Sequence, residues 1–316
     1  MTVVLTPEQV LAKYGPLHCK GFLTLVDEKN GVAQIVEKYT SRGTGEWDIA
    51  NRKRAGGIID DISMEGDSLV MNVIIGERPL NFGPVSADLG GQGVSALKVE
   101  GDEVRTTWHG LAGASVGIGA RIPQCTDVLR TEYPDDFKIG GANYAHVDII
   151  TPKLSRVIIG IDDTDTKEEG ASWVVAFRLG LTSPVGKFIE HKIIQLNPKV
   201  PSKTTNCCST AVSFAVKDSE IPALIEYARN FIRDNSYSKG AVMTVYVGLK
   251  VPEAASKFGW DAKSIMFKPE DAIKVAGECG IQIIHVTGSA GVIGAVAAIG
   301  CFDMGRKSAG VPEDFE

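Results

Sequence analysis

The distribution of apolar and polar positions divides the chain into two halves. In the first half, short runs alternate between apolar and polar residues, as is typical of β-strands with one buried face. We expect these strands over residues 21–27, 31–39, 68–75 and 96–107, the last run turning at Gly101-Asp102 to form two strands. Ahead of them, a short helix is predicted between Thr6, which can cap it, and Gly15, which can end it.

The second half, from residue 157 onward, alternates strand and helix patterns. Strands are expected over residues 157–161, 188–196, 209–216, 241–249 and 281–286, and helices over residues 171–181, 221–234, 269–278 and 292–299. Such alternation is typical of α/β layering. We therefore predict an α/β fold class, with α+β as the alternative. The proline-containing stretch 150–153 is the predicted linker between domains.

The predicted organisation has three parts. Residues 1–153 form a β-rich N-terminal domain of unassigned role, residues 154–303 form an α/β domain, and residues 304–316 form a frayed polar tail.

Composition narrows the classes of protein that the chain can belong to. Of 316 residues, 44% are hydrophobic and 23% are charged, which excludes an intrinsically disordered chain. The longest apolar stretch, residues 292–301, is about half as long as a membrane span requires, and the first residues lack the pattern of an export signal. We therefore expect a cytoplasmic protein with no membrane partner.

Charge and cysteine content add two further expectations. The net charge of −6 makes the chain a poor general binder of nucleic-acid backbones. The six cysteines show no CxxC or zinc-site spacing, so reduced thiols are expected. The adjacent pair Cys207-Cys208 fits either packing or a metal or redox role, with packing favoured.

The first motif that could bind a ligand or take part in catalysis is a cluster of acidic residues at the end of a predicted strand. The apolar strand over residues 157–161 is followed within four positions by three carboxylates, Asp162, Asp163 and Asp165. Charges this crowded repel one another unless a cation or hydrogen-bond donors neutralise them. Mg²⁺ is a suitable cation, because proteins hold it with one or two carboxylates while phosphates and water complete its coordination. A solvated acidic loop is an equally weighted alternative.

The second motif is the loop over residues 196–206, in which two prolines restrict the backbone near two lysines and several hydroxyl groups. Lysine is a compact charge suited to phosphate, and hydroxyl groups can donate to phosphate oxygens. Asn197, Lys203 and Thr204 are its candidate nucleotide-binding residues. Taken alone, the segment is better explained as an ordinary connecting loop.

The third motif, over residues 286–294, is a strand, a glycine loop and a helix start. Glycines let backbone amides approach an anion, and a helix N-terminus favours negative charge. The candidate nucleotide-binding residues are Gly288, Ser289, Gly291 and Gly294. A dinucleotide fold is not expected, because no second strand with an acidic residue follows. Close packing between helix and strand is the equally weighted alternative.

The strand end over residues 160–165, the loop over residues 196–204 and the run over residues 292–300, in this order, resemble the ATP-using half of archaeal agmatinylcytidine synthetase, an enzyme that modifies an isoleucine tRNA. The resemblance covers about residues 157–300 and implies a kinase-like domain that uses ATP and Mg²⁺. It implies that Asp162, Asp163 and Asp165 hold the metal and the phosphates and that Lys203 contacts the triphosphate. Asp162 and Asp163 are the metal candidates, and Asp165 is either a metal ligand or a general base. Thr164, within the same motif, is a further candidate nucleotide-binding residue.

The whole chain resembles methanogenesis marker protein 11 more closely still. That resemblance implies a cytoplasmic protein of methanogenic archaea, linked to methyl-coenzyme M reductase or to cofactor maturation. Two features depart from the synthetase: Ser172 stands near the position of its autophosphorylated threonine, and Thr205-Asn206 replace an arginine-glycine pair. Because the chain ends soon after Gly300, the synthetase's RNA-binding modules have no counterpart, and tRNA is not expected as a partner.

The sequence therefore predicts an ATP- and Mg²⁺-dependent enzyme of phosphoryl or adenylyl transfer, with Asp162, Asp163 and Asp165 as catalytic residues. The acceptor is expected to be a small molecule or a protein, met by the β-rich half, and a homo-oligomer is a further expectation. The alternative is a non-catalytic assembly or maturation factor with a nucleotide-responsive pocket, which the missing threonine and arginine favour.

Overall fold

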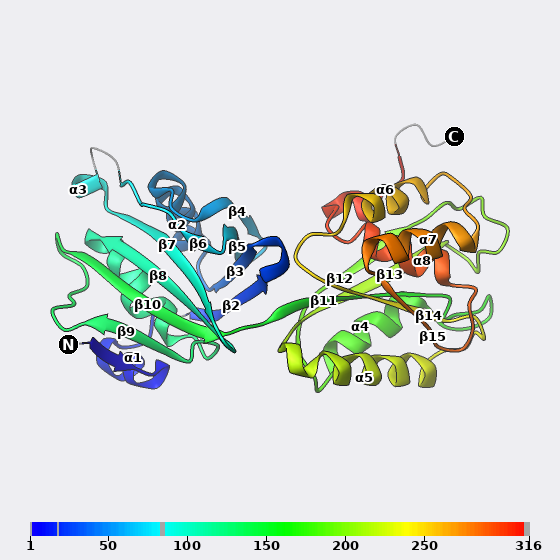
Figure 1. Cartoon of the computed structure of the whole chain (residues 1–316), viewed down its shortest axis with the longest axis horizontal. Helices are drawn as coiled ribbons and strands as arrows, with labels where there is room; N and C mark the ends of the chain where they lie inside the picture. Colours follow the sequence, from blue (N-terminus) through cyan, green and yellow to red (C-terminus); the bar gives the residue numbers. More distant parts are fainter. Residues whose placement is uncertain (1, 18, 83–85, 313–316) are drawn as a thin grey trace. The chain divides into compact units, whose positions relative to one another are not determined.

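The computed structural model describes residues 2–17, 19–82 and 86–312, and its chain divides into two compact units, Met1–Leu154 and Ser155–Glu316 (Figure 1). Each unit is described by itself. The predicted mixed α/β class is confirmed, and all three sheets are antiparallel.

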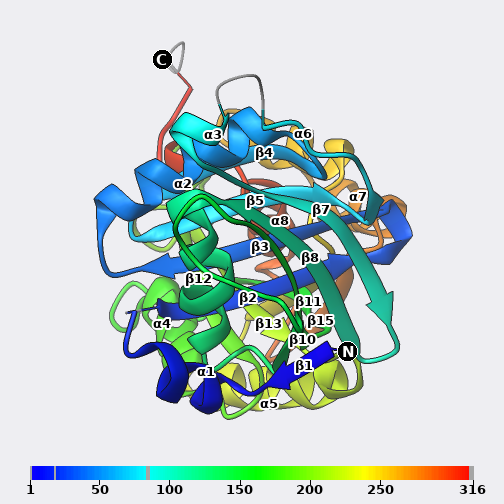
Figure 2. The same cartoon turned by 90° about the vertical axis from the view of Figure 1, so that its left-hand side faces the viewer.

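The first unit contains two sheets (Figure 2). The larger has the order β1-β9-β10-β8-β7-β6, formed by Thr2–Leu5, Arg130–Pro134, Tyr144–Pro152, Glu103–Leu111, Gly91–Glu100 and Gly76–Glu77. The smaller has the order β2-β3-β5-β4, formed by Cys19–Asp27, Val32–Tyr39, Ser68–Ile74 and Ile59–Glu65. Its helices are α1 (Pro7–Tyr14), α2 (Arg42–Ala55) and α3 (Ser86–Leu89).

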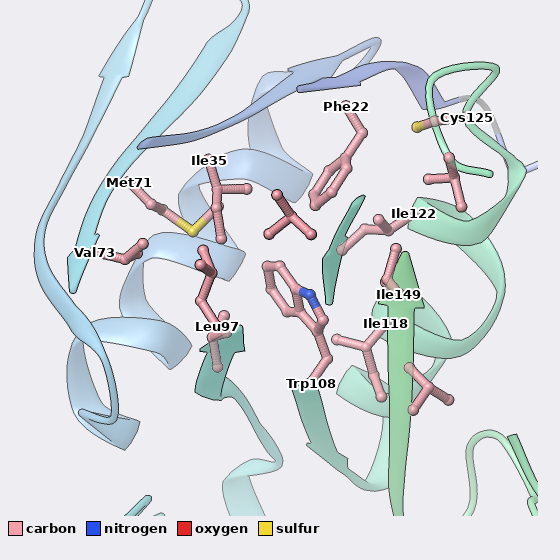
Figure 3. Close-up of a cluster of buried hydrophobic side chains, with 14 of the residues drawn as sticks. Phe22, Ile35, Met71, Val73, Leu97, Trp108, Ile118, Ile122, Cys125 and Ile149 are labelled. Carbon is pink, nitrogen blue, oxygen red and sulfur yellow. The ribbon is translucent and has the colours of Figure 1, made fainter. Parts of the chain in front are cut away.

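The core of the first unit is built around Trp108, which is fully buried (Figure 3). Phe22 meets its ring edge-on at a centroid distance of 6.0 Å. The Trp108 indole N–H donates to Thr106 Oγ1 at 2.8 Å, so that the buried ring leaves no unsatisfied donor. Apolar residues from both sheets, including Ile35 and Leu97, complete this core.

Helices and turns that have capping or turn residues in their own sequence lie where the sequence predicts them. Thr6 and Gln9 form the capping box of α1, and Gly31, at φ 67°, closes the turn between β2 and β3. Helix α2 was not predicted from the sequence, because its residues form no apolar stripe at helical spacing. The face that it buries is polar and includes Asp48, Asn51 and Arg52, whose burial depends on partners from other elements.

The second unit is a five-stranded sheet of order β12-β13-β11-β14-β15, formed by Lys187–Gln195, Cys208–Val216, Ser155–Asp162, Val242–Val247 and Gln282–His285. Its helices are α4 (Ser172–Thr182), α5 (Ile221–Asp234), α6 (Glu253–Asp261), α7 (Pro269–Cys279) and α8 (Val292–Gly300). Helices α4 and α5 cover one face of the sheet, and α6, α7 and α8 cover the other (Figure 1).

Strand β11 determines which way the acidic motif points. Val157, Ile159 and Ile161 pack in the cluster that includes α4 and α5, whereas Ile158 packs in the cluster that includes α8. Because successive side chains of a strand point to opposite faces, Asp162 falls on the α8 face.

The tail predicted to be frayed from residue 304 is ordered through residue 312, whereas residues 313–316 lie outside the described residues. Gly305–Ser308 form a 3-10 helix. The buried ammonium of Lys263 donates to the carbonyl oxygens of Ser308 at 2.7 Å and Gly310 at 2.8 Å, and to that of Gln195 at 2.9 Å. A buried cation requires such acceptors, and the sequence of the tail did not reveal its partner.

We expect Lys263→Met to lower the free energy of unfolding of the second unit by about 1.5–3 kcal/mol, because three carbonyl groups lose a charged donor. Hydrogen exchange should also speed up over residues 305–310. Denaturant unfolding combined with exchange mass spectrometry measures both effects. Lys257→Met is the matched control, since Lys257 is exposed and pairs with Asp261 one turn away. Equal effects of the two substitutions would contradict this role of Lys263.

The expectation of reduced thiols holds for four cysteines and is wrong for Cys125. Cys207, Cys208, Cys279 and Cys301 are free, whereas Cys125 is disulfide-bonded. The expectation came from the lack of an export signal, which carries no information about which thiols the fold brings together.

No helix among the described residues has both the length and the apolar character needed to cross a membrane.

Candidate functional site

A pocket in the second unit brings much of the three sequence motifs together. Its lining includes six of the predicted site residues, which are Asp162, Asp163, Asp165, Lys203, Thr204 and Gly294. They come from the end of β11, the loop before β13 and the first turn of α8. Segments up to 132 positions apart in the chain (Asp162 to Gly294) therefore meet at one place.

The contact between Asp162 and Gly294 sets the geometry of the acidic end. A β-carbon built on Gly294 would overlap Asp162 Oδ2, so only glycine leaves room for the carboxylate at this turn of α8. Upstream on the same strand face, a β-carbon on Gly160 would overlap the carbonyl of Ala295. Helix α8 therefore packs directly on the strand that carries Asp162.

No basic side chain among the described residues forms an ion pair with the three aspartates, although each is half-buried. The pKa of Asp162 is raised to about 8, chiefly by burial and additionally by the charges of Asp163 and Asp165, against a backbone hydrogen bond that lowers it. The pKa of Asp163 is raised as well, first by burial and then by Asp165. The carboxylates of Asp162, Asp163 and Asp165 could therefore bind a cation.

Asp163 is held by a segment that the sequence prediction did not include. Ser238 hydrogen-bonds its carboxylate, and the amides of Tyr237 and Ser238 donate to the carbonyl of Thr164 at 2.8 and 3.3 Å. Asp163 itself has a φ of 58°, in the left-handed region that L-residues rarely adopt. Residues 236–240 lie between a helix and a strand and have a turn composition, which was the available signal.

Lys203 and Thr204 lie opposite the acidic loop. Thr204 Oγ1 donates to Asp165 Oδ1 at 3.4 Å. Lys203 is exposed, and its positive charge lowers the pKa of Cys207 against the larger effect of burial, which raises that pKa to about 11. The lysine is therefore close to the pocket and has no acidic partner among the described residues.

Two predicted nucleotide-binding residues are turned away from the pocket. Thr164 is buried, and its hydroxyl and amide both donate to Ser172 Oγ at 3.0 and 3.2 Å. Asn197 is buried, donates to the carbonyl of Ser264 and accepts from the amide of Lys199, both at 2.9 Å. Both side chains have polar partners within the fold, so they hold loops in place rather than line the pocket.

The glycines of the loop over residues 286–294 allow close packing of the backbone and do not form a phosphate-binding site. A β-carbon on Gly288 would overlap the carbonyl of Lys239, and one on Gly291 would approach that of Asp162 at 2.6 Å. The amide of Gly291 donates to the carbonyl of Gly240 at 3.1 Å, so it is not available to an anion. Ser289 is exposed and does not line the pocket. Of the four predicted residues in this loop, only Gly294 lines it.

The remainder of the lining is largely apolar and was not predicted to bind a ligand, although five of its residues lie within the predicted motifs over residues 196–206 and 286–294. It consists of Leu196, Val200, Ala262, Ile265, Met266, Phe267, Ala290 and Ile293, together with Ser202, Cys207 and Cys208. Ile265 and Met266 are 49% and 57% exposed, so the pocket has an open apolar wall. The thiol of Cys208 donates to Gln195 Oε1 at 3.2 Å, and burial raises its pKa. An exposed apolar pair after a helix was the only signal for this wall.

The residues present are compatible with Mg²⁺ bound together with a phosphate. Among the described residues, no three His, Cys, Asp or Glu side chains form a group that could hold a metal ion alone. Mg²⁺ does not require one, because it is commonly held by one or two carboxylates plus substrate phosphates. Asp162 and Asp163 can supply these carboxylates.

We expect Gly294→Ala to weaken nucleotide binding about tenfold or more, because the new methyl group displaces the Asp162 carboxylate. Isothermal titration with ATP and Mg²⁺ measures the effect. Gly277→Ala, within helix α7, is the matched control: its β-carbon meets nothing within 4 Å, so it should leave affinity unchanged and add about 0.5–1 kcal/mol of stability. Unchanged affinity in Gly294→Ala would show that the carboxylate position is irrelevant.

Comparison with known proteins connects this region to an RNA-modifying enzyme. The family model of the TiaS TCKD domain matches residues 158–221. The tRNA 2-agmatinylcytidine synthetase TiaS of Thermococcus sibiricus is 29% identical over 152 residues, which are 46% of this chain and 35% of that protein. TiaS of Pyrobaculum neutrophilum is 28% identical over 155 residues. The chain therefore spans about a third of the length of these synthetases.

Solved structures of the same enzyme are also similar to part of the chain. The crystal structure of TiaS in complex with its tRNA and ATP has a TM-score of 0.41 and 25% identity over 46% of this chain and 36% of that chain. The crystal structure of TiaS in complex with its tRNA, AMPCPP and agmatine has a TM-score of 0.40 and 23% identity over the same shares of the two chains.

These relatives correct the expectation that tRNA is not a partner. That expectation rested on net charge and on the absence of the synthetase's C-terminal modules, whereas the relatives that match residues of this chain are named for a tRNA substrate. Net charge is a property of the whole surface and does not determine the charge of one local face.

One relative matches nearly the whole chain. The uncharacterized protein MJ0921 of Methanocaldococcus jannaschii is 36% identical over 284 residues, which are 89% of this chain and 93% of that protein. The match extends over both units, unlike those to the synthetases. This chain therefore belongs to the family of MJ0921.

Proposed function

We propose that the second unit binds ATP with Mg²⁺ and that the protein is an ATP-dependent transferase acting on a phosphoryl or adenylyl group. The observation that carries the proposal is the composition of the pocket, which joins an open apolar wall to carboxylates that have no cationic partner in the described part of the chain. The similarity of residues 158–221 to the TiaS TCKD domain supports it independently.

The two kinds of side chain that line the pocket suit the two parts of a nucleotide. Apolar side chains such as Leu196, Met266 and Phe267 offer a surface for a base. Asp162 and Asp163 would hold Mg²⁺, and Lys203 would offset the charge of the phosphates. When bound, Mg²⁺ supplies charge stabilisation at the transferred phosphorus.

The chain's own contribution is positioning. Gly294 leaves room for the Asp162 carboxylate beside α8, Ser238 orients Asp163, and Thr204 orients Asp165. Ser172, near the position of the synthetase's modified threonine, accepts both Thr164 donors within the fold. We therefore propose that Ser172 shapes the loop and that transfer proceeds without a phosphorylated serine at this position.

The acceptor is the less constrained part of the proposal. We propose an RNA of the tRNA class, because the relatives that match 46% of the chain are tRNA-modifying enzymes by name. A role in methanogenesis, which the resemblance to methanogenesis marker protein 11 implies, is a further proposal. The methanogen relative MJ0921 supports it only by its source.

Calorimetric titration with ATP tests the nucleotide site. We expect binding with Mg²⁺ present and much weaker binding after chelation, because the carboxylates repel a bare triphosphate. An absence of heat with ATP and GTP at every Mg²⁺ concentration would contradict the proposal. Product analysis after incubation with total archaeal tRNA then assigns the reaction: ADP indicates phosphoryl transfer, and pyrophosphate, which leaves when AMP is attached to the acceptor, indicates adenylyl transfer. ATP binding without either product would favour a non-catalytic, nucleotide-responsive factor.

A further inference from the structure

A second pocket is lined entirely by residues of the first unit, and none of them belongs to the three motifs discussed above. It is lined by Leu17, Thr44, Trp47, Asp48, Gln92, Gly113, Ala114, Val116, Gly117 and Arg121. Three of these, Asp48, Gln92 and Arg121, are polar side chains that are 2%, 1% and 7% exposed. Burying such groups is costly unless the fold or a ligand satisfies them.

All the acceptor atoms of this polar group are already occupied. Asp48 Oδ1 accepts from Gln92 Nε2, and Asp48 Oδ2 accepts from Arg52, Arg121 and the Tyr39 hydroxyl. Gln92 Oε1 accepts twice from Arg52, at 2.9 and 3.3 Å. The pocket therefore offers no free carboxylate or amide oxygen to a cationic ligand.

The donor atoms are not all occupied. Arg121 makes its hydrogen bonds through Nη2, which donates to Asp48 and to the Tyr39 hydroxyl and lies 3.6 Å from Glu37 Oε2, and its guanidinium stacks over the Tyr39 ring at 4.5 Å. Within the described part of the chain, its Nε and Nη1 have no acceptor, and one N–H of Gln92 Nε2 is also unused. A guanidinium with spare donors, lining a cavity, is suited to a carboxylate, since hydrogen bonds between charged partners are the stronger ones.

The backbone around the pocket leaves space beside Arg121 and Gln92. A β-carbon on Gly117 would lie 3.6 Å from Arg121 Nη2 and 3.7 Å from the Gln92 amide, so the bare glycine leaves open space over both groups. Gly117–Arg121 is a π-helical turn, a feature frequent at functional sites. Ala112, just before the glycine-containing segment, has a φ of 55°, a conformation that alanine rarely adopts.

The remaining wall is aromatic and apolar. Trp47 lines the pocket while 54% exposed, and Leu17 and Val116 lie beside it. An exposed indole next to buried charged donors provides a flat surface for a planar group.

We propose that this pocket binds a small planar molecule that carries a carboxylate, with the carboxylate on Arg121 and Gln92 and the ring system against Trp47. The inference is independent of nucleotide binding, because it uses no residue of the second unit.

Ligand-observed NMR and calorimetry with three aromatic carboxylates, benzoate, nicotinate and indole-3-acetate, test the site on the full chain. Their primary amides are the matched probes without charge. We expect at least one carboxylate to bind, and its amide to bind about tenfold more weakly or not at all. Binding of no carboxylate, or equal binding of carboxylate and amide, would overturn the proposal.

Three variants locate the binding. Trp47→Ala removes an exposed ring and Gly117→Val fills the open space without removing a charge, and both should weaken binding about tenfold. Arg121→Lys keeps the charge but loses donors, and should weaken carboxylate binding more than amide binding. Circular dichroism and thermal unfolding identify variants that are folded. Carboxylate binding that is unchanged in folded Trp47→Ala and Gly117→Val would place the ligand elsewhere and overturn the assignment.

Discussion

Asp162→Asn is expected to weaken Mg²⁺-dependent ATP binding about 100-fold while raising the thermal midpoint of the nucleotide-free protein. The two effects share one cause. Asp162 has no cationic partner among the described residues, and its burial raises its pKa to about 8. The carboxylate therefore costs folding stability unless a metal ion is bound, and asparagine removes both the cost and the ligand.

The direction in which the stability effect of Asp162→Asn changes with pH follows from the pKa of Asp162. Because the pKa of Asp162 is higher in the folded state than its ordinary value near 3.8, the folded state holds its proton more tightly. Stability from this group is fully present at low pH and is lost as pH rises through about 8. The gain in thermal midpoint from Asp162→Asn should thus grow between about pH 4 and pH 8 and level off above.

Differential scanning fluorimetry across this pH range, in chelator, measures the stability effect, and calorimetry measures the binding. Asp234→Asn serves as the control, because Asp234 is an exposed carboxylate outside the pocket. A loss of stability in Asp162→Asn would indicate a structural role, and unchanged ATP affinity would exclude Asp162 as a metal ligand.

The second large effect is expected in the first unit, where Arg52→Met should lower the free energy of unfolding by about 3–5 kcal/mol. Arg52 is fully buried and pairs with Glu37 at 3.1 Å and Asp48 at 3.3 Å. Its guanidinium also lies 4.8 Å from the centre of the Trp108 ring. Methionine can fill the space, but it leaves two buried carboxylates with less compensating charge.

Hydrogen-exchange mass spectrometry can confine this effect to the first unit, with the largest loss of protection expected in β3 and β7, which carry Glu37 and Gln92. Lys53→Met, one position along the same helix, is exposed and should change stability by about 0.5 kcal/mol or less. Similar effects of the two substitutions would show that the buried charges are not mutually dependent.

Glu37, which pairs with Arg52, makes the stability of the first unit depend on pH. Burial raises its pKa, but the charges of Arg52 and Arg121 outweigh burial, and the net shift is downward. Its contribution to stability is therefore present above its ordinary pKa and is lost as pH falls, opposite in sign to that of Asp162.

Elements that carry their own local signals were predictable from the sequence. The capping box at Thr6, the turn at Gly31 and the helix Pro269–Cys279 followed by Gly280 all lie where expected. Helix α6 and helix α2 were missed, in the second case because α2 buries polar rather than apolar residues. Such burial is stable only with partners such as Glu37 and Gln92 that lie on other strands, and no local pattern reveals them.

The candidate site divides in the same way. The acidic strand end was visible in the sequence, because a buried strand followed by three aspartates is unusual without a cation. Thr164 and Asn197 were predicted to bind nucleotide because of their residue type and position. Their side chains instead form hydrogen bonds with neighbouring backbone and side-chain groups. The sequence singled out Cys207 and Cys208, but only the folded loops show that they line the pocket together with the apolar residues around Met266.

The sequence by itself determined the strand and helix periods, the acidic motif and its order relative to the lysine and glycine motifs, because these depend on neighbours along the chain. Tertiary structure alone decided which faces those elements present. It placed Asp162 against Gly294, turned Thr164 inward and left Nε and Nη1 of Arg121 without an acceptor in the part of the chain it describes. The physical reason is that burial, pKa and unused hydrogen-bonding capacity depend on atoms brought together from distant positions, and periodicity carries no information about them.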